Sequence, residues 1–294
     1  MAVPSDTFAL AGLPCSRGPK LLSRDICRMT VSNRLDRTLS TARAEGRTVL
    51  SPYITVGFPD VPTSVDIAEA ILRNGGDLLE IGVPFSDPMA DGPTVQKTSF
   101  HALQHGVSVQ TCLDAVRQLR SRGVESPLML MGYYNPFLKY GLRDLVRDAA
   151  AAGVQGLIVP DLPPEESSDL ESLCAENNIH QIHFVALTST DSRIKYICAR
   201  ASGFIYCVAV LGVTGARQSI HAGVAELVGR VKRHTDVPVI QGFGVSSKEH
   251  IDAIANYADG AIVASAMFDA IEHAPADRKV QAAVDFVKAL KGIS

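Results

Sequence analysis

The sequence lacks the features of a secreted, membrane-spanning or nucleic-acid-binding chain. Its six cysteines are scattered and no two have CxxC spacing, so in a chain of this length we expect reduced thiols rather than a disulfide framework. With a net charge of −3 and no dense basic run, it is a poor partner for nucleic acids or anionic membranes. The longest apolar stretches, such as 261–268, are far too short to span a bilayer. These absences predict a cytoplasmic protein.

The first 32 residues have a composition of their own. They are rich in serine and basic residues, and their only acids are Asp6 and Asp25. We expect a flexible leader here, or a start site set upstream of the true one, with Met29 as the next candidate. The alternative is an organellar transit segment, which would place the protein in a plastid. The chain therefore divides into a leader, 1–32, and one folded domain, 33–294.

Short aliphatic runs recur along the folded domain and predict β-strands. They cover 50–56, 78–81, 128–131, 157–159, 182–186, 204–208, 237–240 and 260–263. Between the runs lie segments with apolar residues at helical spacing, of which 61–74, 142–152 and 247–257 are the clearest. No linker-like tract interrupts this alternation, so a single domain is expected.

The number and burial of these strands define the fold class. Strands that are apolar on both faces and alternate with helices indicate a parallel sheet. Eight of them in a core of about 260 residues favour a closed (β/α)8 TIM barrel over an open doubly wound sheet. The stretch between Pro84 and Pro127 is long enough for two helices, 94–105 and 108–120, so we expect one inserted helix after strand 2. An extra helix is expected at the N-terminal end of the barrel.

Three acids lie in or just after the second predicted strand. Glu80 stands in an aliphatic run, and Asp87 and Asp91 follow in a loop framed by prolines. In such barrels the residues at the C-terminal ends of strands point into the active site, where Tyr53 and Tyr206 are also expected. Burial raises the pKa of a carboxyl group towards the range useful for proton transfer. We therefore favour a catalytic Glu80 over the alternative, a buried acid paired with an arginine or an amide.

Three turns rich in glycine or other small residues follow the last three predicted strands, at 211–217, 241–246 and 263–266. Glycines let the backbone approach an anion closely, and a helix N-terminus directs N–H groups towards it. Phosphate sites built from the loops after strands seven and eight are common in these barrels. Ordinary connecting turns would account for one such segment, but three together predict a phosphate site.

Several motifs together resemble one family closely, the tryptophan synthase alpha subunits and the related indole-3-glycerol phosphate lyases. The motifs are PYITVG at 52–57, EIGVPFSDP at 80–88 with ADGP at 90–93, MGYYNP at 131–136, VPDLP at 159–163, GVTGAR at 212–217 and QGFGVS at 241–246. These motifs occur in the same order as in the family and extend over nearly the whole chain after the leader. One departure is Ala264, which stands where the family usually has glycine.

The resemblance implies retro-aldol cleavage of indole-3-glycerol phosphate to indole and glyceraldehyde 3-phosphate. Glu80 matches the general acid/base that protonates the indole C3, Asp91 the acid that serves the indole N–H, and Tyr206 the tyrosine beside the glutamate. The implied indole pocket consists of Tyr53, Val95, Met131, Ile158 and Phe243. The implied phosphate site consists of Gly215, Gly244 and Ser265. No metal is implied.

The resemblance also implies a partner. Pro84, Asp87 and Thr214 match positions that take part in loop closure and in contact with a beta subunit, so Asp87 is an interface residue rather than a third catalyst. The expected assembly is an alpha2beta2 complex in which pyridoxal phosphate belongs to the beta subunit and this chain needs no cofactor. Two alternatives stay open: a stand-alone lyase that releases indole, and a weakly active subunit that mainly activates a beta chain.

Overall fold

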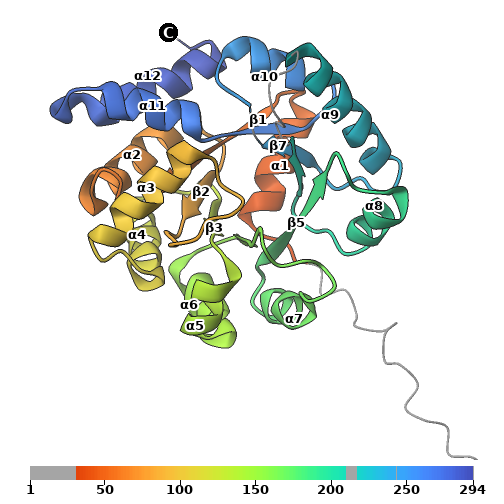
Figure 1. The fold of residues 1–294 in the computed structure, drawn as a ribbon, viewed down its shortest axis with the longest axis horizontal. Coiled ribbons are helices and arrows are strands. Elements are labelled where there is room, and N and C mark those ends of the chain that lie inside the picture. The colour runs from red at the N-terminus through yellow and green to blue at the C-terminus, as the bar shows by residue number, and fades with distance from the viewer. Residues whose placement is uncertain (1–30, 210–216, 243, 294) are drawn as a thin grey trace, which may run out of the picture. The chain divides into compact units, whose positions relative to one another are not determined.

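The computed structural model describes residues 31–209, 217–242 and 244–293, and of 217–222 only the backbone. Its strands are β1 (Val49–Thr55), β2 (Leu79–Gly82), β3 (Leu128–Met131), β4 (Gly156–Ile158), β5 (His180–Ala186), β6 (Ile205–Val208), β7 (Val239–Gly242) and β8 (Gly260–Val263). All neighbours are parallel, and β8 returns to pair with β1, so the sheet closes into a barrel (Figure 1). The predicted TIM barrel is therefore confirmed, and β3 and β8 begin and end at the predicted residues.

The described chain has twelve α-helices, and all but α1 surround the barrel and cover the outer faces of its strands (Figure 1). They are α1 (Arg34–Ala44), α2 (Val61–Arg73), α3 (Pro93–Gln104), α4 (Val109–Ser121), α5 (Tyr134–Tyr140), α6 (Leu142–Ala152), α7 (Ser168–Glu176), α8 (Asp191–Cys198), α9 (Arg217–Lys232), α10 (Lys248–Ile254), α11 (Ser265–His273) and α12 (Lys279–Lys291), with a 3-10 turn at Ala276–Arg278. Both α3 and α4 lie between β2 and β3, which confirms the inserted helix. Among the described helices, none is both long and apolar enough to cross a lipid bilayer.

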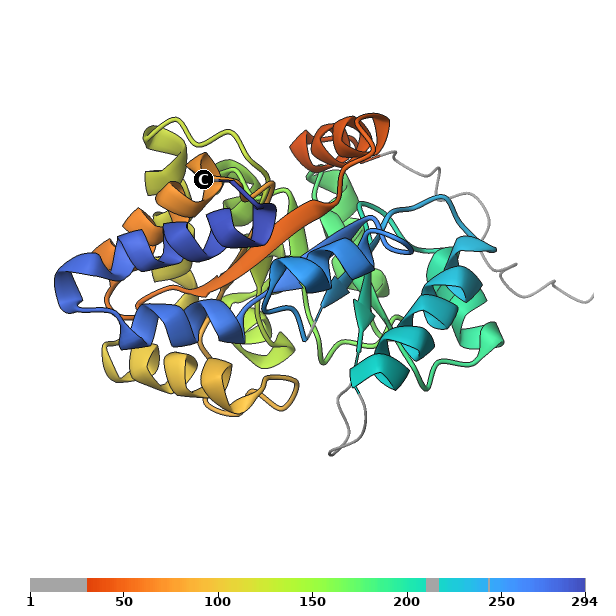
Figure 2. The same ribbon diagram turned by 90° about the horizontal axis from the view of Figure 1, so that it is seen from above.

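The extra N-terminal helix, α1, lies across one end of the barrel (Figure 2). Leu35 and Leu39 are buried on its inner face and pack into the apolar interior of the barrel. Asn33 and Asp36 form a capping box at its start, and Asp36 also pairs with His180 at the beginning of β5. This end is therefore closed by apolar packing and hydrogen bonds, and a ligand has to enter from the other end. Of the predicted leader, 1–32, only Val31 and Ser32 are among the described residues.

Two glycines on the inner face make room for large rings. A Cβ atom on Gly82 of β2 would lie 2.1 Å from the hydroxyl of Tyr53, and one on Gly242 of β7 would lie 2.5 Å from that of Tyr206. Any side chain at either position would collide with a tyrosine that fills the barrel. The glycines therefore allow both phenols to stand beside Glu80, at the level where the interior opens towards the C-terminal ends of the strands.

Candidate active site

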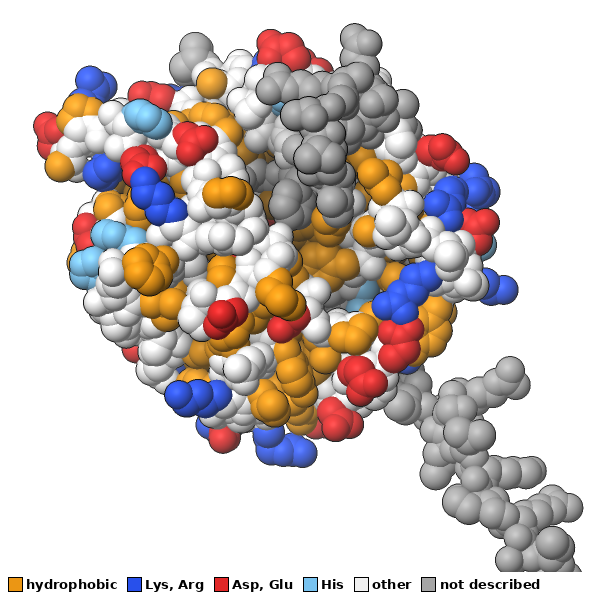
Figure 3. Space-filling view, viewed as in Figure 1, with side chains coloured by type: hydrophobic (Ala, Val, Ile, Leu, Met, Phe, Trp, Pro, Cys, Tyr) orange, Lys and Arg blue, Asp and Glu red, His pale blue; other side chains and the backbone are white. Residues whose placement is uncertain are grey.

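A cavity of about 400 Å³ opens at the C-terminal ends of the strands. On the face seen in Figure 3, hydrophobic side chains gather around a central hollow, and acidic side chains lie near its edge. The predicted site residues that line the cavity are Tyr53, Glu80, Asp91, Val95, Met131, Tyr206, Gly244 and Ser265. The fold therefore collects, in one space, residues from six different strands or the segments that follow them.

Glu80 lies at the floor of this cavity and is completely buried. Its Oε1 accepts a hydrogen bond of 3.2 Å from the hydroxyl of Ser51, while Oε2 has no partner among the described residues. Burial is the main influence on the carboxyl group and raises its pKa to about 8, with Ser51 acting in the opposite direction. Glu80 is therefore a protonated acid near neutral pH, and no arginine or amide side chain holds it in the described part of the site.

Asp91 lies further up the cavity, at the end of the loop that follows β2. Its carboxyl group accepts a hydrogen bond from the hydroxyl of Tyr133, which in turn accepts one of 2.8 Å from the N–H of Ala90. Partial burial raises the pKa of Asp91 to about 6, and the hydrogen bond from Tyr133 limits this rise. Asp91 is therefore mainly ionised near neutral pH, in contrast to Glu80.

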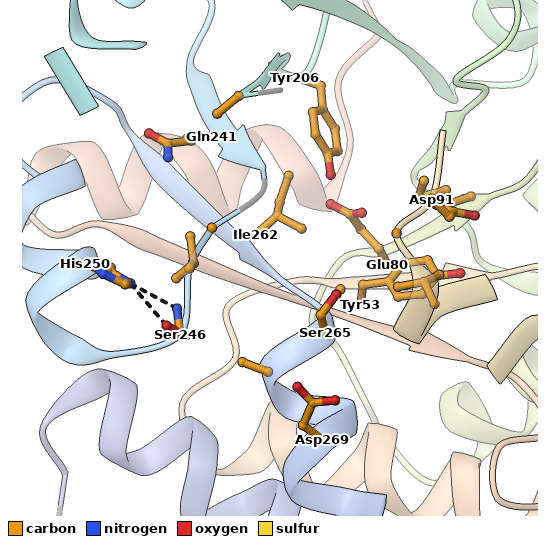
Figure 4. A pocket seen from close by; sticks show the side chains of 18 residues that line it. Tyr53, Glu80, Asp91, Tyr206, Gln241, Ser246, His250, Ile262, Ser265 and Asp269 are labelled. Atoms are coloured by element: carbon orange, nitrogen blue, oxygen red, sulfur yellow. Dashed lines mark hydrogen bonds between the residues drawn. The ribbon is translucent and has the colours of Figure 1, made fainter. Parts of the chain in front are cut away.

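The two carboxyl groups consequently have opposite protonation states in one cavity. Figure 4 shows the carboxyl group of Glu80 below the phenol of Tyr206, with Tyr53 and Asp91 beside it. Burial, together with the charges of Glu80 and Asp91, raises the pKa of both tyrosines well above the usual value, so both phenols keep their protons. A pair of acids whose environments move their pKa values apart is the arrangement by which enzymes provide an acid and a base at one pH.

The opposite end of the cavity is formed by β7, β8 and the segments after them. Ser265 begins α11, and Gly244 has a φ of 77°, a conformation that favours glycine. The N–H of Ser246 donates to Nδ1 of His250, and Asp269 of α11 also lines the cavity. Among the described lining residues there is no lysine or arginine. An anion at this end would therefore be held by N–H and hydroxyl groups, with His250 as the only basic side chain in the described lining.

Ala264 precedes Ser265 and is the residue that departs from the family pattern. Its φ of −132° lies outside the left-handed region that favours glycine. The backbone at the start of α11, where the first N–H groups of the helix lie, therefore does not require the left-handed conformation of a glycine at this position.

Other predicted site residues lie away from the cavity lining. Ile158 is completely buried in the barrel interior and is not among the residues that line the cavity. Pro84 is buried at the start of the loop after β2, and Asp87 is exposed in that loop, where it accepts a 2.5 Å hydrogen bond from Ser86. The predicted residues outside the described part of the chain are Thr214, Gly215 and Phe243.

Several lining or supporting residues were not singled out from the sequence: Ser51, Tyr133, His250 and Asp269. Ser51 stands two residues before Tyr53, so the alternation of a strand places both on the inner face, and this signal could have identified it. Tyr133 reaches Asp91 from the segment after β3 through a contact that no local pattern reveals.

The barrel and the pair of acids at the C-terminal ends of its strands define a class: a (β/α)8-barrel enzyme with an acid–base site. Comparison with known proteins gives the family. The family model for the tryptophan synthase alpha chain matches residues 39–292, and the chain belongs to this family, which cleaves indole-3-glycerol phosphate. The resemblance seen in the motifs is thereby confirmed.

Individual relatives agree with this assignment. The chain is 49% identical over 260 residues to the tryptophan synthase alpha chain of Roseiflexus sp. (strain RS-1), covering 88% of this chain and all of the relative. It is 38% identical to the tryptophan synthase of Saccharomyces cerevisiae, matching 88% of this chain but 37% of that longer protein. Among solved structures, the alpha subunit from Legionella pneumophila superposes with a TM-score of 0.81 at 32% identity, covering 89% of this chain and 98% of that one. A chain of tryptophan synthase from M. tuberculosis superposes with a TM-score of 0.79 at 36% identity, covering 88% of this chain and 98% of that one.

Proposed function

We propose that this chain catalyses retro-aldol cleavage of indole-3-glycerol phosphate, with Glu80 as general acid/base and Asp91 as the base that serves the indole N–H. The observation that carries the proposal is the pair of carboxyl groups in one cavity, with pKa values of about 8 and about 6. A protonated acid and an ionised acid are what this reaction requires near neutral pH. The barrel, residues 33–294, is the proposed catalytic domain.

The proposed reaction needs one proton to be delivered and one to be taken away. The carboxyl group of Glu80 protonates C3 of the indole, and positive charge develops on the ring nitrogen. Asp91 accepts a hydrogen bond from the indole N–H and stabilises that charge. The C3–C3′ bond then breaks, its electron pair returns to the indole ring, and the C3′ hydroxyl becomes the aldehyde. The carboxylate of Glu80 takes the hydroxyl proton and regains the form in which it began.

The shape of the cavity fits the two ends of this substrate. Apolar and aromatic walls from Tyr53, Val95 and Met131 surround the two acids and suit a flat bicyclic ring. The phosphate group would lie at the other end, against Gly244 and the first N–H groups of α11 at Ser265. The remaining predicted residues of these two subsites are Phe243 and Gly215, which complete the indole wall and the phosphate site in the proposal. Ile158 would act from below as part of the packed floor.

A beta chain is the proposed partner, in an alpha2beta2 assembly. The loop after β2 exposes Met89 (85%), and α5, which follows Tyr133, exposes Leu138 (52%). In this proposal the beta chain covers both side chains and removes their apolar surface from water. Pro84, Asp87 and Thr214 belong to the closing loops in this proposal. Pyridoxal phosphate is assigned to the beta chain, the reaction in this chain uses side-chain acids alone, and the proposed location is the cytoplasm.

Indole release from indole-3-glycerol phosphate tests the proposal directly. We expect slow release by the chain alone and faster release when a tryptophan synthase beta chain is added, because the partner would hold the loop after β2 in its closed position. The measurement is the initial rate of indole formation with and without the added beta chain. A matched control is the double variant Met89→Ser, Leu138→Ser, which should keep the basal rate and lose the increase.

Each outcome has a clear meaning. No indole in either condition would refute the proposed activity. A full rate that no beta chain changes would refute the partner dependence and support the stand-alone lyase. A trace of activity in this chain, together with strong activation of the beta chain by it, would support the weakly active partner subunit.

A further inference from the structure

Ser51 is a polar residue inside the barrel that the proposed chemistry does not yet use. It lies on the inner face of β1, two residues before Tyr53, and is completely buried. In the strand register, Tyr53 stands opposite Glu80, and Ser51 stands opposite Ile262 of β8. Ser51 is therefore the diagonal neighbour of Glu80 across β1 and β2, close enough for side chains on one face to interact.

The contact between the two residues is specific. The hydroxyl of Ser51 donates to Oε1 of Glu80 at 3.2 Å. No other described residue makes a hydrogen bond to this carboxyl group. The carbonyl oxygen of a protonated carboxyl group is its stronger acceptor, so acceptance at Oε1 favours the proton on the other oxygen. The proton that Glu80 can deliver is therefore on Oε2, which no protein group engages in the described part of the site.

We propose that Ser51 is a positioning residue for Glu80: its hydroxyl fixes one carboxyl oxygen so that the transferable proton lies on the other, and it stabilises the ionised form left after transfer. The expected changes in kcat and kcat/KM rest on the proposed function. The hydrogen bond and its effect on the ionisation of Glu80 do not. A buried carboxylate without any hydrogen-bond donor would be costly to form, so the corresponding carboxylic acid would be a poor proton donor. Among the described residues, Ser51 makes the one hydrogen bond to this carboxyl group.

The other groups facing Glu80 do not supply that donor in the described structure. Tyr206 of β6, Tyr53 of β1 and Asp91 of the loop after β2 are the titratable groups around it, and β3 presents Met129 and Met131 from the neighbouring strand. Asp91 is an acid, and when ionised it has no proton to donate to Glu80. Among these groups no lysine, arginine or histidine is present, so the hydrogen bond from Ser51 is the main favourable influence on the carboxylate.

The test compares Ser51→Ala, which removes the hydroxyl, with Ser51→Thr, which keeps it. We expect Ser51→Ala to move the alkaline limb of the kcat/KM profile up by roughly one pH unit and to lower kcat roughly tenfold, with little change in KM. Ser51→Thr should retain the limb of the parent chain. Ser64→Ala, which removes another buried hydroxyl from α2, serves as the control for general loss of stability.

A second measurement is independent of the substrate. Difference infrared spectroscopy of the free chain can follow the protonated carboxyl band of Glu80, identified by its disappearance in Glu80→Gln. The band should persist to higher pH in Ser51→Ala than in the parent chain, even if indole-3-glycerol phosphate proves not to be the substrate. An unchanged titration of this band in Ser51→Ala would overturn the proposal. An equal loss of kcat in the alanine and threonine variants, with no shift of either limb, would also overturn it.

Discussion

Replacing Glu80 with glutamine is expected to lower kcat for indole release by roughly 10²–10⁴-fold, the usual contribution of a positioned general acid. Glutamine keeps the shape of the side chain and the contact with Ser51 but has no proton that it can transfer to C3 of the indole. The residual rate, measured as indole formation under saturating substrate, should no longer follow the ionisation of residue 80. Binding of indole, measured by titration, should change little because the apolar walls are intact.

Stability measurements separate loss of catalysis from loss of the fold. The folded chain holds the proton of Glu80 up to about pH 8, whereas the unfolded chain releases it near the ordinary pKa of about 4.5. The contribution of this group to stability is therefore fully present below about pH 4.5 and is lost progressively as the pH rises to about 8. Glutamine does not ionise, so the urea midpoint of Glu80→Gln, relative to the parent chain, should rise between about pH 5 and about pH 8. Parent-like turnover in this variant would refute the catalytic assignment.

Replacing Asp91 with asparagine should also lower kcat by roughly 10²–10⁴-fold, but for a different reason. The positive charge that develops on the indole ring needs a nearby anion, and asparagine provides only a neutral carbonyl oxygen. The hydrogen bond from Tyr133 can still form, so the loop should keep its position. The measurement is the same rate of indole formation, with KM determined in parallel.

A control for Asp91 is an acid of the same type outside the cavity. Asp114 lies exposed on α4 and pairs with Arg117, and Asp114→Asn should leave kcat and KM unchanged. If Asp91→Asn retained the parent rate, or lost activity only through a higher KM, the carboxylate would not stabilise the transition state. The proposed division of labour between the two acids would then fail.

The strands could be predicted because each leaves a local mark in the sequence. A strand that is buried on both faces appears in the sequence as an aliphatic run. For β3 and β8 the predicted first and last residues are those of the structure. The prediction for β7 begins two residues early, at Val237, because Pro238 is apolar but has no N–H to donate to the barrel. Helix α6 was likewise predicted with its bounds, since its apolar residues recur at helical spacing.

Features that depend on contacts between distant segments could not be predicted in this way. Helix α5 begins at Tyr134, whose N–H donates to Asp161 from the loop after β4, and nothing in the local sequence reveals that cap. The role of Ser51 depends on the register of β1 and β2, which the closed barrel sets. Ile158 is expected in the indole wall; its side chain is completely buried and is not among the residues that line the cavity, although it pairs in register with Met131, which does.

The candidate acids could be predicted because their positions are unusual. Glu80 is a charged residue in an apolar run at the C-terminal end of a strand, and Asp91 follows in the connected loop, so the barrel geometry alone directs both towards one cavity. Their protonation states could not be predicted, because they depend on how deeply each carboxyl group is buried and on which hydroxyl reaches it. Ser51 and Tyr133 supply those hydroxyls.

The pH dependence of kcat/KM for indole release tests the central claim most directly, since it reports the protonation states of the free enzyme. If Asp91 must be ionised and Glu80 protonated, the profile is bell-shaped, with an acid limb near pH 6 and an alkaline limb near pH 8. The alkaline limb should move in Ser51→Ala and disappear from the residual activity of Glu80→Gln. A profile that continues to rise above about pH 8 would contradict the account, because it would mean that the enzyme works with Glu80 ionised.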